Sequence, residues 1–134
     1  MSDPYYCKLY VDSDEEIKSL ESALGEASAE IFAEISVEYP VFENEDFDFR
    51  SREKVPYDFI ECSRYYVELG TVERIPDQLP DFQSGVAALV KNLREGGRFV
   101  TASCDFEDVV ADATGWNWTK RKPEPPGRAI TGSR

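Results

Sequence analysis

Apolar residues follow two different spacings along this chain, one typical of strands and one typical of helices. The order of the segments with each spacing limits the fold more than any other feature. Apolar and polar side chains alternate in four segments, which predicts half-buried strands at residues 5–11, 29–39, 63–69 and 99–104. Apolar side chains three and four positions apart predict a first helix, which starts at a capping box of Ser13 and Glu16 and stops at Gly25. The same spacing predicts a second helix at residues 81–95, ended by two glycines.

This order predicts an α+β domain with a ferredoxin-like β-α-β-β-α-β fold. Right-handed crossovers and pairing of neighbouring segments lead to a four-stranded antiparallel sheet with two helices on one face, with the strands in the order 4-1-3-2. The connection at residues 39–61 is longer than such a hairpin needs. At 134 residues the chain fits a single acidic α+β domain, which we place at residues 1–119. Residues 120–134 are basic and contain prolines and glycines, which predicts a flexible tail.

The charge of the chain predicts its class of partner. The net charge is −12, and residues 1–119 hold 26 of the 27 acidic residues. Such a surface repels the phosphates of nucleic acids and of anionic membranes, and it attracts basic surfaces. We therefore expect a protein partner with a basic surface, no nucleic acid and no membrane.

The absence of histidine removes the usual general base, the common zinc ligand and every Ser-His or Cys-His pair. We expect no enzyme activity, no cofactor and no metal, although chemistry by carboxylates stays open. No apolar run suits a signal peptide or a membrane span, and three cysteines without framework spacing suit a reducing compartment. These features predict a cytoplasmic protein.

The acidic side chains gather in the first third of the chain, where residues 12–48 hold 13 acidic residues and one lysine. Three glutamates share one side of the predicted strand 29–39 with a phenylalanine, and the loop that follows interleaves carboxylates with phenylalanines. Long loops in small domains are often functional. The candidate partner-binding residues are Glu30, Phe32, Glu34, Glu38, Glu43, Glu45, Asp46, Phe47, Asp48 and Tyr66.

Other interpretations of these residues stay open. Charges on an edge strand also prevent aggregation, and a half-exposed sheet face is often a mixture of solvated side chains. A homodimer through the aromatic sheet face is a further alternative. A calcium site is disfavoured, because residues 43–48 lack the glycine and the terminal glutamate of an EF-hand loop.

Further residues have an expected structural place. Cys7 and Cys104 are expected to face inward at one end of the sheet and Cys62 at the other, so the thiols do not converge on a metal. Trp116 and Trp118 are expected to pack the last segment onto the domain. Asp105 or Asp108 is expected to cap a short helix after the last strand.

Three segments resemble a known class of protein. They are Tyr65-Tyr66-Val67-Glu68-Leu69, the helix end Leu93-Arg94-Glu95-Gly96-Gly97, and Val100 through Cys104-Asp105-Phe106-Glu107-Asp108. Together they resemble small acidic bacterial immunity proteins of polymorphic or contact-dependent toxin systems. The resemblance implies a cytoplasmic inhibitor that neutralises a toxic domain, often a basic nuclease, by covering its active site. It brings no catalytic residues with it.

Two other functions remain alternatives. The chain could form a dimeric ferredoxin-like sheet that binds a small ligand or acts as a cofactor-free enzyme, with Tyr6, Tyr10, Arg64 and Tyr66 around a pocket. It could also be a structural subunit of a larger assembly, with an apolar patch that only the complex buries.

Overall fold

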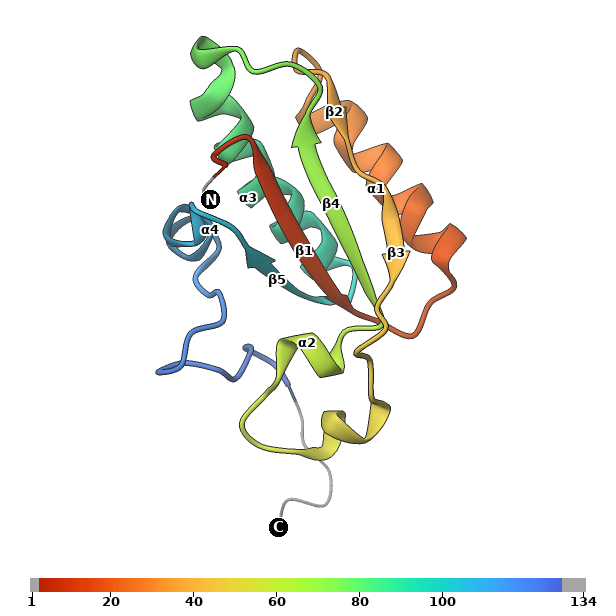
Figure 1. Ribbon diagram of the computed structural model, residues 1–134. Coiled ribbons are helices and arrows are strands. Elements are labelled where there is room, and N and C mark those ends of the chain that lie inside the picture. Colours follow the sequence, from red (N-terminus) through yellow and green to blue (C-terminus); the bar gives the residue numbers. More distant parts are fainter. Residues whose placement is uncertain (1–2, 129–134) are drawn as a thin grey trace.

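The computed structural model describes residues 3–128 and has an α+β architecture (Figure 1). Within these residues the strands are β1 (Tyr6–Asp12), β2 (Val37–Glu38), β3 (Val41–Glu43), β4 (Tyr65–Thr71) and β5 (Phe99–Ser103). The α-helices are α1 (Ile17–Ile31), α2 (Phe59–Cys62), α3 (Leu79–Glu95) and α4 (Glu107–Thr114). Two short 3₁₀ helices, η1 (Phe49–Glu53) and η2 (Pro76–Gln78), complete the set.

The strands form one antiparallel sheet in the order β2-β4-β1-β5, and β3 also pairs with β4. Leu9 in the centre of β1 lies opposite Val67 of β4 and Ala102 of β5. This register turns the apolar residues of all three strands to the same face, because side chains alternate along a strand. The α+β class and the antiparallel sheet are confirmed, but the described residues contain five strands where we predicted four.

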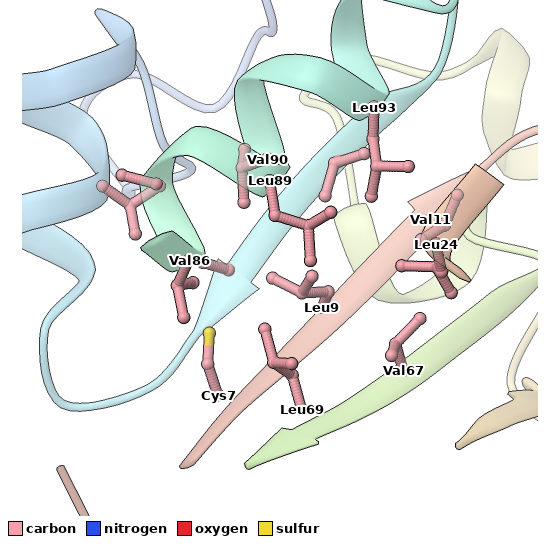
Figure 2. Close-up of a cluster of buried hydrophobic side chains, with 14 of the residues drawn as sticks. Cys7, Leu9, Val11, Leu24, Val67, Leu69, Val86, Leu89, Val90 and Leu93 are labelled. Atoms are coloured by element: carbon pink, nitrogen blue, oxygen red, sulfur yellow. The ribbon is translucent and has the colours of Figure 1, made fainter. Parts of the chain in front are cut away.

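Helices α1 and α3 cover the apolar face of the sheet (Figure 1). Figure 2 shows Leu24 of α1 and Val86, Leu89 and Leu93 of α3 packed over the strands. All four side chains are fully buried. Helix α4 packs beside α3 and adds Val110 to the same core. None of the described helices is both long and apolar enough to cross a membrane.

The predicted strand at residues 29–39 is wrong over most of its length. Helix α1 continues past Gly25 to Ile31, and only the two residues of β2 are extended in this region. The helical turns after Gly25 bury Ala27 and Ser28, following Leu20 and Leu24 at helical intervals. Their burial outweighs the cost of about 1 kcal/mol for a glycine inside a helix.

The two outer edges of the sheet are protected in different ways. Pro40 separates β2 from β3, so this edge consists of two short strands with a proline between them. At the other edge, side chains occupy the free backbone groups of β5. Asn117 donates to the Ala102 carbonyl and accepts from the Ala102 N–H, both at 2.9 Å. Arg94 donates to the Val100 carbonyl at 3.1 and 2.7 Å.

The start of α4 differs from the prediction. Phe106 is its N-cap and makes no side-chain hydrogen bond, so neither Asp105 nor Asp108 caps the helix. Glu107 instead accepts a hydrogen bond from the Cys104 N–H at 3.0 Å. The carboxylate therefore satisfies the end of β5, next to the groups bound by Asn117.

The segment after α4 is attached to the body of the protein, as we predicted for its two tryptophans. Trp116 is 6% exposed and donates to the Lys122 carbonyl at 3.0 Å, and the half-buried Trp118 donates to the Tyr57 carbonyl at 2.8 Å. Arg128 donates to the carbonyls of residues 52 and 54, both at 2.9 Å. Glu124 and Arg128 thus bind the 52–57 segment, whereas residues 120–122 are exposed, and the flexible tail stays a prediction; residues 129–134 lie outside the described part of the chain.

Candidate functional site

A line of exposed carboxylates follows the β2–β3 side of the sheet. It begins in the turn after α1, passes along β2 and β3, and ends in the loop after β3; α1 lies beside these strands (Figure 1). None of these carboxylates forms an ion pair with a residue in the 3–128 range. We call this surface the acidic edge, and its residues are Glu34, Glu38, Glu43, Glu45 and Asp46. The predicted binding residue Glu30 is also exposed, but it lines a hollow with Lys91 and Glu95 of α3, away from this surface.

The loop at residues 44–48 is held firmly against α2. The Asn44 side-chain amide donates to the carbonyls of Ile60 and Ser63 at 2.7 and 2.8 Å, and its oxygen accepts the Asp46 N–H at 3.1 Å. The Asp48 N–H donates to the Glu61 carbonyl at 2.8 Å. These bonds fix the backbone, so Glu45 and Asp46 point into solvent from an ordered loop.

Three of the predicted binding residues make contacts within the protein, but only one of them is buried. Phe32 is 4% exposed and lies in the core against Phe82, because it caps α1 instead of standing on an exposed strand face. The half-buried Phe47 ring is covered by the Arg52 guanidinium at 5.0 Å. Asp48 forms an ion pair with Arg50 at 3.1 Å, which offsets its charge. Burial makes Phe32 unsuitable for direct contact with a partner, and the other predicted residues, Phe47 and Asp48 included, remain predictions.

Aromatic rings cross the open face of the sheet, next to the acidic edge. Successive ring centroids are 5.2, 6.2, 5.2 and 5.1 Å apart, all within the range of favourable aromatic contacts. We call this set the aromatic row, and in spatial order it contains Phe42, Tyr66, Tyr10, Phe59 and Trp118.

Phe42, at the β3 end of the aromatic row, is its most exposed ring, whereas Tyr66, Phe59 and Trp118 are half-buried. Tyr10 is 9% exposed, because α2 and the segment after α4 bring Phe59 and Trp118 over the sheet. Phe42 remains 39% exposed, and the Lys8 ammonium lies 4.2 Å from the centre of the Tyr66 ring. The open rings therefore adjoin β3 and its carboxylates.

Charges of both signs surround Tyr6 on this face of the sheet. Burial and the neighbouring Glu68 carboxylate raise the pKa of Tyr6 to about 12. Tyr6 lines a hollow of about 230 Å³ together with Glu38, Glu68 and Arg74. Two of the four residues named for the ligand-binding alternative are engaged elsewhere, since Tyr10 packs against Phe59 and Arg64 donates to the Asp14 carbonyl at 2.9 Å.

A buried polar network anchors the 49–62 segment to the end of the sheet. Arg52 binds the Asp12 carboxylate at 2.9 Å and also pairs with Asp14, and the Tyr57 hydroxyl donates to Asp12 at 3.0 Å. Burial raises the pKa of Asp12, although Arg52 and Tyr57 act in the opposite direction. Asp14 is 81% exposed, and the buried Arg52 Nη2 atom contacts Asp12 without a well-directed hydrogen bond, so the Asp12–Tyr57 bond is the best-formed polar contact at this end of the fold.

Glu15 adds a pH-dependent contribution to stability. Two bonds from Arg98, at 2.6 and 2.7 Å, lower the pKa of Glu15 from 4.5 to about 2, despite its burial. A carboxyl group with a lowered folded-state pKa stabilises the fold fully above pH 4.5, and this contribution is lost as the pH falls toward 2. Allowing for the 15% exposure of the side chain, we expect the contribution to be about 1–2 kcal/mol.

The measurement is urea unfolding between pH 6 and pH 2 of the wild type and of E15Q. The wild type is expected to lose more stability than E15Q in this window. E53Q, which changes an exposed glutamate, is the control and is expected to follow the wild type. Parallel pH profiles for the wild type and E15Q would contradict the assignment.

The thiols lie where the sequence placed them. Cys7 is buried at one end of the sheet, where burial and the Cys104 thiol raise its pKa, whereas Cys62 belongs to the second apolar cluster with Tyr57 and Trp116. Within residues 3–128 no three metal-ligating side chains come together.

The chain matches no protein-family model, no curated protein and no solved structure. The geometry of its surfaces therefore carries the functional argument. Exposed carboxylates on an ordered loop and open rings beside them can bind a cationic surface and exclude water from the contact. The acidic edge and the end of the aromatic row are the candidate functional site.

Proposed function

We propose that this protein is a cytoplasmic binding protein that neutralises a basic toxic domain, in the manner of an immunity protein. The acidic edge would hold the cationic surface of the partner, and Phe42 and Tyr66 would supply apolar contact area beside it. The observation that carries this proposal is the acidic edge itself, whose exposed carboxylates have no ion-pair partner within the described residues.

The physical argument is that unpaired like charges on one surface cost free energy in the isolated protein. A partner of opposite charge removes this cost and is steered toward the surface, which raises the association rate by about 10- to 1000-fold at low salt. A chain that used these carboxylates for solubility alone would not need rings of Phe42 and Tyr66 stacked at 5.2 Å next to them. The acidic edge is thus better suited to recognition.

The sheet supports a one-to-one complex. We infer that β2 and β3 are two halves of one interrupted strand, which makes the fold a variant of the ferredoxin-like order predicted from the sequence. The interruption by Pro40 and the side chains of Asn117 and Arg94 disfavour pairing with the sheet edges of a second copy. The partner would then be held by side chains.

The test starts from the product of the gene adjacent to that of this chain, for which the proposal expects a large secreted protein with a basic C-terminal domain; that domain is then the binding partner in the assay. The combined variant E34K/E38K/E45K/D46K is expected to lower the association rate constant at least about tenfold at about 50 mM salt. It is also expected to leave cells that express the domain unprotected. The effect on the rate should shrink at about 300 mM salt, where exposed charges are screened.

A matched control separates local from overall charge. The variant E95K/D105K/D108K/D112K changes the net charge equally, at exposed positions on α3, α4 and the turn before α4. It is expected to keep protection and to bind at nearly the wild-type rate. An equal loss of association rate in both variants would show that net charge, and not the acidic edge, determines binding. Binding by the first variant at the wild-type rate would refute the proposal.

A further inference from the structure

A second pocket lies at the opposite edge of the sheet from the acidic edge. It has a volume of about 420 Å³, within the range of small-molecule sites. Its walls come from the end of α3, the start of β5, the end of α4 and residues 125–127. Two of the lining residues, Arg94 and Arg98, are cationic and none is acidic, in a chain with 27 acidic and 15 basic residues.

Arg94 is held in this pocket without an anionic partner. Its guanidinium donates to the Val100 carbonyl, to the Thr114 hydroxyl at 2.8 Å and to the Trp116 carbonyl at 3.0 Å. All of these acceptors are neutral, and no carboxylate of the described residues lies within ion-pair distance. Burial lowers the pKa of Arg94 to about 10, so the side chain is still charged at neutral pH. A half-buried charge that lacks a counter-charge is costly, and a bound anion would offset that cost.

Arg98 brings a second set of donors to the same pocket. Glu15 occupies its Nε and Nη2 atoms, at 2.6 and 2.7 Å, and orients the guanidinium. Its Nη1 makes no hydrogen bond to the described residues. Arg94 uses four of its five N–H donors, so one also remains on that side chain.

The remaining walls are apolar. Phe99, Val100, Trp116 and Pro125 line the pocket beside the two guanidinium groups. The Arg94 guanidinium lies 5.2 Å from the Trp116 ring, which fixes the cation next to an aromatic surface. A ligand that fits must therefore combine an anionic group with an apolar body.

We propose that this pocket binds a small carboxylate that carries an apolar ring. The carboxylate accepts hydrogen bonds from the free donors of Arg98 and Arg94, because planar guanidinium groups match the geometry of carboxylates. The ring lies against Phe99, Trp116 and the prolines. The acidic edge takes no part, so this site is independent of the proposed function.

The experiment is isothermal titration of the full chain with sodium phenylacetate at neutral pH and low salt. We expect a dissociation constant below about 1 mM. Phenylacetamide, which has the same ring without the charge, is expected to bind at least about tenfold more weakly. Inorganic phosphate, which has the charge without the ring, is also expected to bind at least about tenfold more weakly. Absence of phenylacetate binding at about 5 mM, or equal binding of either comparison ligand, would overturn the proposal.

Variants locate the site. R98Q is expected to weaken phenylacetate binding at least about tenfold, whereas R50Q, which removes an exposed arginine outside the pocket, is expected to leave it unchanged. P126W fills the pocket from its exposed rim without changing either guanidinium, and it is expected to weaken binding even if R98Q is unstable. Unchanged binding by P126W would place any observed ligand elsewhere and refute this site.

Discussion

Replacing Phe32 by alanine is expected to lower the free energy of unfolding by about 3–5 kcal/mol. The ring is 4% exposed and lies 6.0 Å from the Phe82 ring, in the layer between the end of α1 and α3. Its removal takes away buried apolar area and leaves a cavity that the rigid ends of two helices can close only in part. Urea unfolding followed by circular dichroism measures the loss.

Gly85 of α3 provides an internal check on this packing. A Cβ atom at Gly85 would lie 2.4 Å from the Phe32 ring, so G85A forces the ring to move and is expected to destabilise the wild type by about 1–3 kcal/mol. In the F32A background the space is free, and the helix preference of alanine over glycine, about 1 kcal/mol, is expected to make the same change stabilising. The change of sign is the result that identifies the contact.

Two outcomes would contradict this account. An F32A variant within about 1 kcal/mol of the wild type would place the ring outside the core. Additive effects of F32A and G85A would show that the two residues do not touch. F32L removes the aromatic ring but keeps most of the side-chain volume. It separates the two effects and is expected to lose less stability than F32A.

The error at Phe32 shows which part of the fold could be predicted from the sequence. In β1 and β4 one face is buried and the other is largely open, so alternation predicted the inward residues Leu9, Val67 and Leu69 correctly. In residues 29–39 the apolar residues fit both the alternation of a strand and the spacing of a helix, since Ile31 and Ile35 also lie about one helical turn apart. The longer helix forms in place of the predicted strand because it buries Ala27, Ser28 and Phe32 against α3.

The candidate site also has features that could be predicted from the sequence and features that could not. The exposure of Glu34, Glu38 and Glu45 could be predicted, because a charged side chain without a partner stays in water whatever the local backbone does. The internal use of Phe47 and Asp48 could not, since it depends on Arg50 and Arg52 of the following turn. The pocket at Arg94 was also missed. It forms only because residues 114–127 return to β5, and no local pattern in the sequence reports such a return.

A substitution at Asn117, which protects the edge of β5, is expected to cause the second large loss of stability. The buried side chain, 4% exposed, matches the Ala102 backbone with one acceptor and one donor, each at 2.9 Å. N117D keeps the shape but replaces the donor by an oxygen that faces the Ala102 carbonyl. At pH 7 this places a negative charge in a buried position against another acceptor, and we expect a loss of about 3–5 kcal/mol in the free energy of unfolding.

The loss caused by N117D is expected to depend on pH, and the direction follows from proton linkage. Burial and the facing carbonyl raise the pKa of the introduced carboxyl in the folded state above its unfolded value of about 3.9. Between these two values the folded protein binds more protons than the unfolded one, so lowering the pH stabilises the variant relative to the wild type. Once protonated, the carboxyl donates to the Ala102 carbonyl again. N117A, which loses both bonds but has no titrating group, is expected to show a loss that does not change with pH. Because the comparison is isosteric, a loss for N117D that is the same at pH 7 and pH 4 would mean that the side chain at position 117 does not pair with the edge of the sheet.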